Sequence, residues 1–491
     1  MNLLYLIWIP LLTALAILPS GRAGLARMVA LFGSVAQLLM AIMLYASYYR
    51  AHISSPGTPY FFEQRYDWFP AWNISLHVGV DGISVAMILL TALVVVAGVL
   101  MSWNMQKKER EYFFLLIMLS LGAYGFFISL DLLVMFFFLE VAVIPKFLLI
   151  GIWGSGKKEA SANKLALMLM GGSALVLVGI LALYFSGGNS FDITQLAGQS
   201  ISIHIQRVFF PFLFLGFGVF TALFPFHTWV PDGHSSAPTA GSMFLAGISM
   251  KLGGYGCLKI AMYLMPYGAV VYSNIIVLLA AIAILYGAFA TMMQRDMKYM
   301  NAYSSISHCG FVLLGMGMIT RTAISGAVMQ MVSHGLMTAL FFAVIGMIYE
   351  RTHTRQVNEM GGLMRRMPFV MSILYISGLC SLGLPGLSGF VAEMTVFVGS
   401  WERADLFHRM ATVAGAMSIV VTAVYILKAV TRVAMGSLPA DFEKLEDARW
   451  NEKLAAVVLI AGILAIGLLP GWLNDLVKPG SEMIMNQINF K

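Results

Sequence analysis

Long apolar segments separated by short polar ones follow one another along almost the whole chain. Each apolar segment holds close to the ~20 residues that a helix needs to cross ~30 Å of hydrocarbon. The pattern predicts an all-α integral membrane protein that forms one membrane domain over residues 1–491. About fourteen transmembrane helices are predicted, at residues 3–20, 27–48, 82–104, 112–129, 130–153, 163–186, 206–226, 241–264, 272–293, 301–320, 323–349, 369–400, 409–434 and 453–474.

Composition excludes an ordinary soluble protein. Hydrophobic residues make up 59% of the chain and charged residues only 11%, whereas a soluble domain carries about 25% charged residues. The net charge of +7 does not indicate nucleic-acid binding, because the basic residues lie in short loops between apolar segments. The cysteines, Cys257, Cys309 and Cys380, lie in apolar segments without a CxxC pair, so neither an iron–sulfur cluster nor a zinc site is indicated.

Lysine and arginine are distributed unevenly between the loops, and this asymmetry predicts the orientation. Loops after odd-numbered spans are rich in both, so they are expected on the cytoplasmic side of a bacterial inner membrane. Both termini then lie outside, residues 436–453 form a cytoplasmic connector, and residues 49–81 form an outside loop with a short hairpin. The start of the chain has no basic stretch, so we expect a first span there and no cleaved signal peptide. The basic residues after odd-numbered spans are Arg22, Lys107, Lys108, Arg110, Lys157, Lys158, Arg295, Lys298, Arg351, Arg355, Arg365, Arg366, Lys444 and Arg449, and those after even-numbered spans are Arg50, Arg65, Arg321 and Arg403.

Two predicted spans, the seventh and the twelfth, contain helix-breaking residues. The segment 210–234, which extends past the end of the seventh, includes Pro225 and Pro231, and the twelfth includes Pro385 and Gly386. They occupy the same place in two successive groups of five spans, 4–8 (about 112–264) and 9–13 (about 272–434). Because five is odd, the two groups have inverted orientations. Broken helices at matching places in inverted repeats indicate an ion pathway; simple proline and glycine kinks are the alternative.

Three ionisable residues lie deep inside predicted spans, where a charge costs at least ~2.5 kcal/mol. Glu140 lies near the middle of span 5, Lys251 near the middle of span 8, and Glu393 just after the break in span 12. Such groups are functional candidates by default. The alternatives are a structural ion pair for Glu140, a structural partner of a carboxylate for Lys251, and a charge that caps broken backbone for Glu393.

Other lysines have positions that are less clear. Lys146 directly follows Pro145, and its long stem could carry the ammonium toward the cytoplasm. Lys259 and Lys428 lie nearer the ends of their spans, and for these two we expect the ammonium to reach the membrane surface.

Three histidines accompany these residues: His227, His308 and His334. A neutral imidazole both donates and accepts hydrogen bonds and titrates near physiological pH, which suits a proton relay. A structural hydrogen bond is the alternative for each of them. Protons fit this set better than sodium, because a sodium site needs several convergent oxygens, whereas lysines and histidines exchange protons.

Several motifs resemble one family: VGVDGIS at 78–84, FFFLE at 136–140, FPFHTWVPDGHSSAPTAG at 224–241, KYMNAYSSISHCGFVLLG at 298–315, MVSHGL at 331–336 and GLPGLSGFVAE at 383–393. Over almost the whole chain they resemble the antiporter-like subunits of proton-pumping NADH:quinone oxidoreductase, respiratory complex I. The glutamate of GFVAE, where other large subunits carry lysine, points to the M-type subunit.

The resemblance implies a fourteen-helix fold with two inverted five-helix repeats and a hydrophilic axis through the membrane centre. It also implies that Glu140, Lys251 and Glu393 transfer protons and that His227, His308 and His334 line the axis. The expected partners are other membrane subunits, including neighbouring antiporter-like subunits, and the lipid bilayer. We expect no cofactor in this chain; NAD, FMN, iron–sulfur clusters and quinone are expected in partner subunits.

The sequence departs from the family at one position. The family usually carries a lysine in span 7, seven residues before the histidine of FPFH, but here that residue is Phe220. Lys146 occupies a place in span 5 where apolar residues are more usual. We therefore hypothesise that the partner of Glu140 has moved from span 7 to span 5.

The same motifs leave two other functions open. A cation/proton antiporter or membrane-hydrogenase subunit would share them, and the missing lysine in span 7 allows a scaffold that does not pump.

Overall fold

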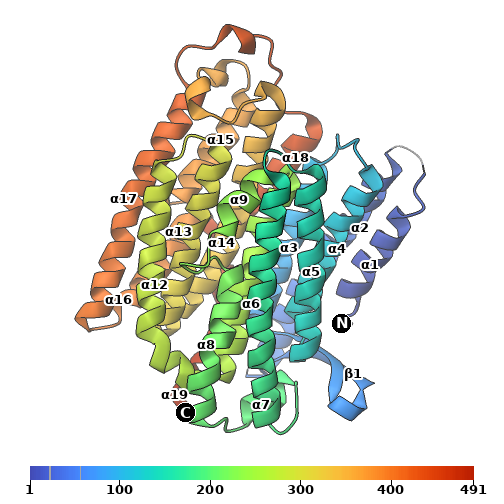
Figure 1. Ribbon diagram of the computed structural model, residues 1–491, viewed down its shortest axis with the longest axis vertical. Coiled ribbons are helices and arrows are strands. Elements are labelled where there is room, and N and C mark those ends of the chain that lie inside the picture. Colours follow the sequence, from blue (N-terminus) through green and yellow to red (C-terminus); the bar gives the residue numbers. More distant parts are fainter. Residues whose placement is uncertain (22–23, 56, 491) are drawn as a thin grey trace.

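The computed structural model describes residues 1–21, 24–55 and 57–490. Arg22, counted above among the cytoplasmic arginines, lies outside the described residues. The helices run roughly side by side, with a two-stranded hairpin at one end and an irregular connector at the other (Figure 1). These ends are called the hairpin side and the connector side below.

Helices account for most of the described chain. The α-helices are α1 (Tyr5–Ile17), α2 (Leu25–Ser54), α3 (Gly82–Met101), α4 (Glu109–Ile128), α5 (Leu132–Trp153), α6 (Lys158–Ser186), α7 (Ile193–Gly198), α8 (Ile203–Phe220), α9 (Trp229–Ser236), α10 (Thr239–Phe244), α11 (Met250–Gly256), α12 (Pro266–Met292), α13 (Met297–Met318), α14 (Arg321–Thr352), α15 (Pro368–Ser381), α16 (Ser388–Trp401), α17 (Leu406–Ala434), α18 (Trp450–Leu468) and α19 (Gly471–Phe490). Two π-helical segments, η2 (Leu245–Ser249) and η3 (Cys257–Met262), flank α11, and short 3₁₀ turns are η1 (Pro70–Trp72), η4 (Val357–Glu359), η5 (Leu363–Arg365) and η6 (Ala440–Phe442).

Ten helices within the described ranges are long and apolar enough to cross a membrane. Every predicted span overlaps one or more of the observed helices. The two predicted interruptions are present: α8 ends at Phe220 before the short α9, and α15 ends at Ser381 before α16. The division between spans 4 and 5 is also confirmed, because Asp131 caps α5 by accepting hydrogen bonds from the backbone N–H groups of Leu133 and Val134.

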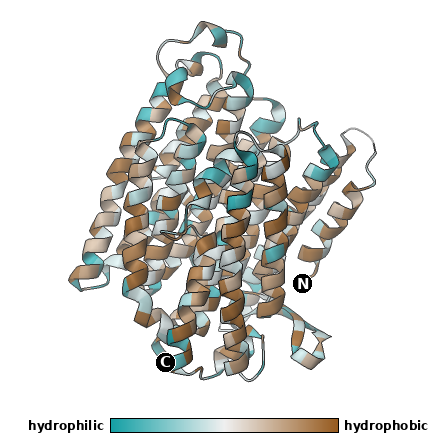
Figure 2. Ribbon diagram, in the orientation of Figure 1, coloured by the Kyte–Doolittle hydropathy of each residue, from teal (hydrophilic) through white to brown (hydrophobic). Residues whose placement is uncertain are grey.

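The outer helices present apolar side chains to the surroundings, and α14 is buried along its apolar length. Leu167, Phe185 and Val420 are among the large hydrophobic side chains left exposed. Figure 2 shows apolar residues along the outer helices and hydrophilic residues gathered at the connector side. This distribution matches a protein whose outer surface is solvated by lipid tails.

The predicted hairpin is confirmed. Strands β1 (Phe61–Phe69) and β2 (Ile74–Val80) pair in antiparallel register. His77 of β2 ties the hairpin to the loop after α6, because its Nδ1 lies 2.9 Å from the Asp192 carboxylate. Its Nε2 lies 3.2 Å from Glu63 of β1.

A pair of matching contacts joins loops to helix starts at the two sides of the molecule. Asp131 at the start of α5 forms an isolated β-bridge with Asp192, which follows α6. Asp296 at the start of α13 forms one with Gln356, which follows α14. Asp296 also caps its helix, as Asp131 does.

The end of the chain differs from the prediction. The predicted span 453–474 is interrupted, since α18 ends at Leu468 and a separate helix, α19, begins at Gly471. Helix α19 packs against α3 and α14 at the hairpin side. It is amphipathic and contains Pro479, so it lacks the continuous apolar run on which the prediction of spans rested.

Candidate functional site

Lys251 lies in the short helix α11, between the two π-helical segments η2 and η3. Its side chain is 2% exposed. The Nζ atom donates to the carbonyl of Ala246 at 2.5 Å and to Nδ1 of His334 at 2.7 Å. Segments of π-helix occur frequently at functional sites, and here they bring a buried lysine against a histidine of the central helix α14.

His334 and His308 continue this polar row. The two imidazole rings are tilted toward one another with centroids 5.5 Å apart. Nδ1 of His308 lies 3.2 Å from a carboxylate oxygen of Glu393. Nε2 of the same ring pairs with the hydroxyl of Ser381 at 3.0 Å. The four residues form a buried row, called the central axis below: Lys251, His334, His308 and Glu393.

The break between α15 and α16 places part of this axis. Ser381 is the last residue of α15, and Glu393 lies in α16, which resumes at Ser388. Gly383 in the break has a positive φ, and a side chain added there would lie 2.8 Å from the Glu393 carboxylate. The interrupted backbone therefore makes room for the carboxylate beside His308.

Lys146 lies at the other end of the site. Its side chain is 1% exposed, so the ammonium does not face lipid and does not reach the surface at the connector side. The Nζ atom lies 5.8 Å from the ring centroid of Phe220, the last residue of α8. Within the described residues the ammonium has no direct hydrogen-bond partner, and the Glu140 carboxylate is the charged group that acts on it electrostatically.

Glu140 is half-buried. Phe137 and Ile144, on neighbouring turns of α5, are 50% and 62% exposed. One carboxylate oxygen of Glu140 is buried and has no hydrogen-bond partner among the described side chains and backbone. The carboxylate therefore lies at the edge between the interior, with Lys146, and the outer face of α5.

The other histidines differ in their surroundings. His227 lies in the break between α8 and α9 and packs against the rings of Phe224 and Tyr286, so the structure does not join it to the central axis. His234 of α9, which we did not single out, is fully buried. It lies within the electrostatic reach of Lys251 and Lys298. Its only sequence signal was its place in the motif FPFHTWVPDGHSSAPTAG at 224–241.

Lys259 corrects the sequence interpretation. It does not reach the membrane surface: its side chain is 1% exposed, and Nζ lies 2.6 Å from Asp81. Tyr60 also accepts from Nζ at 3.2 Å. Lys428, by contrast, is exposed.

Lys298, counted above as a loop lysine, is also buried. It is the second residue of α13, and its Nζ donates to the carbonyl of Ala237 at 2.7 Å. Its value as evidence for the orientation is therefore smaller than that of the exposed lysines. The cysteines Cys257, Cys309 and Cys380 are buried and free.

Comparison with known proteins places this geometry in a family context. The family profile described as "NADH:quinone oxidoreductase/Mrp antiporter, TM" matches residues 129–418. NAD(P)H-quinone oxidoreductase chain 4 of Microcystis aeruginosa is 35% identical over 95% of this chain and 89% of its own length. The corresponding protein of Synechococcus elongatus is 36% identical over 95% and 88%.

Solved structures share the fold. A chain of respiratory complex I from Thermus thermophilus with bound NADH superposes with a TM-score of 0.90 and 24% identity over 99% of both chains. A chain of the Mrp complex from Dietzia sp. superposes with a TM-score of 0.87 and 18% identity, covering 99% of this chain and 98% of the other.

Proposed function

The chain belongs to the NADH:quinone oxidoreductase/Mrp antiporter family of membrane subunits, and we propose that it is the proton-translocating M-type subunit of a bacterial NADH:quinone oxidoreductase. The observation that carries this proposal is the central axis, a row of buried ionisable side chains from four different helices, α11, α13, α14 and α16. Buried ionisable groups inside membrane helices are costly and mark proton relays.

The axis can transfer a proton in steps. The Lys251 ammonium donates to Nδ1 of His334, and an imidazole that gains a proton at one nitrogen can release one from the other. His308 then connects to the Glu393 carboxylate at 3.2 Å. One charge moved against 100 mV costs about 2.3 kcal/mol. We propose that quinone reduction in partner subunits supplies this free energy, and that NAD, FMN, iron–sulfur clusters and quinone are bound there.

Lys146 replaces the lysine that the family usually carries in span 7. Its ammonium lies over the ring of Phe220, the residue that stands where the family carries that lysine. An aromatic face attracts a cation, and this contact keeps the ammonium in the interior, within the electrostatic reach of Glu140. A cation is needed near Glu140 because a charged side chain inside a membrane domain is costly unless it is paired.

The half-buried position of Glu140 is evidence that another membrane subunit lies against α5. A carboxylate at the outer edge of α5 is too costly to leave to lipid. We propose that a neighbouring antiporter-like subunit covers this face, so that Glu140 connects the axes of two subunits.

About fourteen membrane crossings in two inverted repeats complete the proposed architecture. The matched bridges support the repeats: in each, the second helix starts with a capping aspartate that pairs with the segment after the third helix. The first of these bridges lies beside the hairpin, since Asp131 accepts a hydrogen bond from Ser75 of β2. We assign the connector side to the cytoplasm and the hairpin side, with both termini, to the outside.

A lysine exchange tests the proposed function. Lys251→Met removes the buried ammonium, whereas Lys428→Met removes an exposed one. We expect the Lys251 variant to assemble and to lose most of its NADH-driven proton pumping in proteoliposomes, while the Lys428 variant pumps normally. Equal pumping by both variants would mean that the chain is a scaffold.

A further inference from the structure

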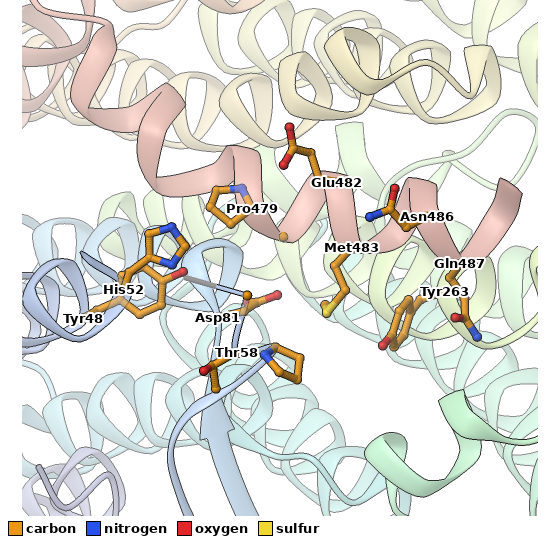
Figure 3. Close-up of a pocket in the computed structure, with 13 residues that line it drawn as sticks. Tyr48, His52, Thr58, Asp81, Tyr263, Pro479, Glu482, Met483, Asn486 and Gln487 are labelled. Atoms are coloured by element: carbon orange, nitrogen blue, oxygen red, sulfur yellow. The ribbon is translucent and has the colours of Figure 1, made fainter. Parts of the chain in front are cut away.

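A cavity of about 520 Å³ opens at the hairpin side. Figure 3 shows α19 along one side of it, with Tyr48, His52 and Asp81 across from Met483. Its lining is mixed, with carboxylates, amides and a histidine among apolar side chains, so water can enter it. Of these groups, Asp81 is the one that contacts charged and polar residues of the interior.

Asp81 forms a buried ion pair behind this cavity. Its Oδ2 accepts from Lys259 at 2.6 Å, and the two side chains are 3% and 1% exposed. Its Oδ1 accepts from both the backbone N–H and the hydroxyl of Ser84, at 2.8 Å and 2.9 Å. Because removing two charges from water offsets much of their attraction, such a pair is weak evidence for a role in stability.

Hydroxyl groups connect this ion pair with the helix that carries Lys251. The Ser84 hydroxyl lies 2.8 Å from the phenol of Tyr255, which is fully buried. Tyr255 follows Lys251 by four residues within α11, so these two side chains lie on neighbouring turns of one helical face, and Lys259 follows by four more residues in η3. A hydroxyl that both donates and accepts can pass a proton along such a chain.

We propose that Tyr255, Ser84 and the Asp81–Lys259 pair form a proton-release path from Lys251 to the cavity at the hairpin side. This inference rests on the proposed function of Lys251. The Lys251 ammonium gives up one proton to a water molecule that bridges it to the Tyr255 hydroxyl, and it becomes a neutral amine. Tyr255 and Ser84 each accept a proton while passing on their own, and Asp81 receives it. Neutralised Asp81 loses its attraction to Lys259 and then releases the proton to water in the cavity, which restores the ion pair.

Two isosteric substitutions test the path. Tyr255→Phe and Ser84→Ala each remove one relay hydroxyl, and Ser84→Ala leaves the backbone cap to Asp81 in place. The matched control is Tyr112→Phe. Tyr112 lies in α4, and its buried phenol pairs with the hydroxyl of Ser102 at 3.0 Å. The measurement is the proton-to-electron ratio of the whole complex in proteoliposomes, with Lys251→Met and the double variant Lys251→Met/Tyr255→Phe in the same series.

We expect Tyr255→Phe and Ser84→Ala to lose the same share of pumping as Lys251→Met, with no further loss in the double variant and none in Tyr112→Phe. A wild-type ratio in assembled Tyr255→Phe and Ser84→Ala complexes, beside a deficient Lys251→Met complex, would overturn the path alone. So would an additional loss in the double variant or an equal loss in Tyr112→Phe. A wild-type ratio in Lys251→Met would instead overturn the proposed function of the axis.

Discussion

The residues at positions 146 and 220 determine which cation lies near the Glu140 carboxylate. The aromatic ring at Phe220 cannot carry a charge, but it lies under the Lys146 ammonium. A lysine is a flexible point charge on a long stem, so its helix of origin can change while the position of the ammonium is kept. The relocation hypothesis therefore makes a prediction about exchange between these two sites.

Lys146→Met is expected to reduce proton pumping strongly, because it removes the cation that acts on the Glu140 carboxylate and leaves that charge unpaired inside the membrane domain. Phe220→Lys in the Lys146→Met background should restore part of the pumping, since it returns a cation to the same space. The proton-to-electron ratio of the assembled complexes measures both effects. A fully active Lys146→Met complex would refute the relocation.

At the same scale, the sequence marked Glu140, Lys251 and Glu393 as candidates, because each is an ionisable residue in an apolar span. It could not predict that Lys259 is buried in an ion pair. Nearness to the end of a span suggested the membrane surface, whereas Asp81, 178 residues away in the chain, holds the ammonium inside. Contacts between distant segments leave no trace in the local pattern of a single sequence.

At the scale of elements, helices were predictable where a long apolar run or a helix breaker marks them. The breaks after Phe220 and Ser381 followed from proline and glycine. The amphipathic helix α19 was missed because its polar residues interrupt any apolar run. The hairpin was predicted, but its attachment to the loop after α6 through His77 and Asp192 was not.

This attachment predicts a pH dependence for the hairpin. Burial of His77 opposes protonation, but the hydrogen bonds and charges of Asp192 and Glu63 together outweigh burial and raise the pKa of His77 above its ordinary value of 6.5. The stabilisation is therefore fully present below the unfolded-state pKa and is lost as pH rises through the raised pKa.

Tryptic cleavage after Arg65 of β1 can follow this change, with His77→Gln as the reference at each pH. At low pH the wild-type hairpin should be cleaved more slowly than the variant, and the two rates should converge as pH rises. A ratio of rates that does not change with pH would contradict the role of His77.

At the scale of the whole molecule, the chain combines a lipid-solvated exterior with a buried polar axis. The sequence predicted this contrast, because composition excluded a soluble fold and the misplaced charges marked the interior. It could not predict which groups touch: Lys251, His334, His308 and Glu393 come from separate helices, and His227 lies apart from them. Only packing around the buried helix α14 decides those contacts.

The central claim is that protons move through this interior, and Glu140→Gln tests it most directly. The change keeps the shape of the side chain and removes its charge. The matched control is Glu402→Gln, which alters an exposed carboxylate just after α16. The measurement is NADH-driven proton pumping, with quinone-coupled turnover, of the purified complexes in proteoliposomes. We predict that Glu140→Gln complexes assemble but lose most of both activities, while Glu402→Gln complexes keep them; full pumping by assembled Glu140→Gln complexes would contradict the account.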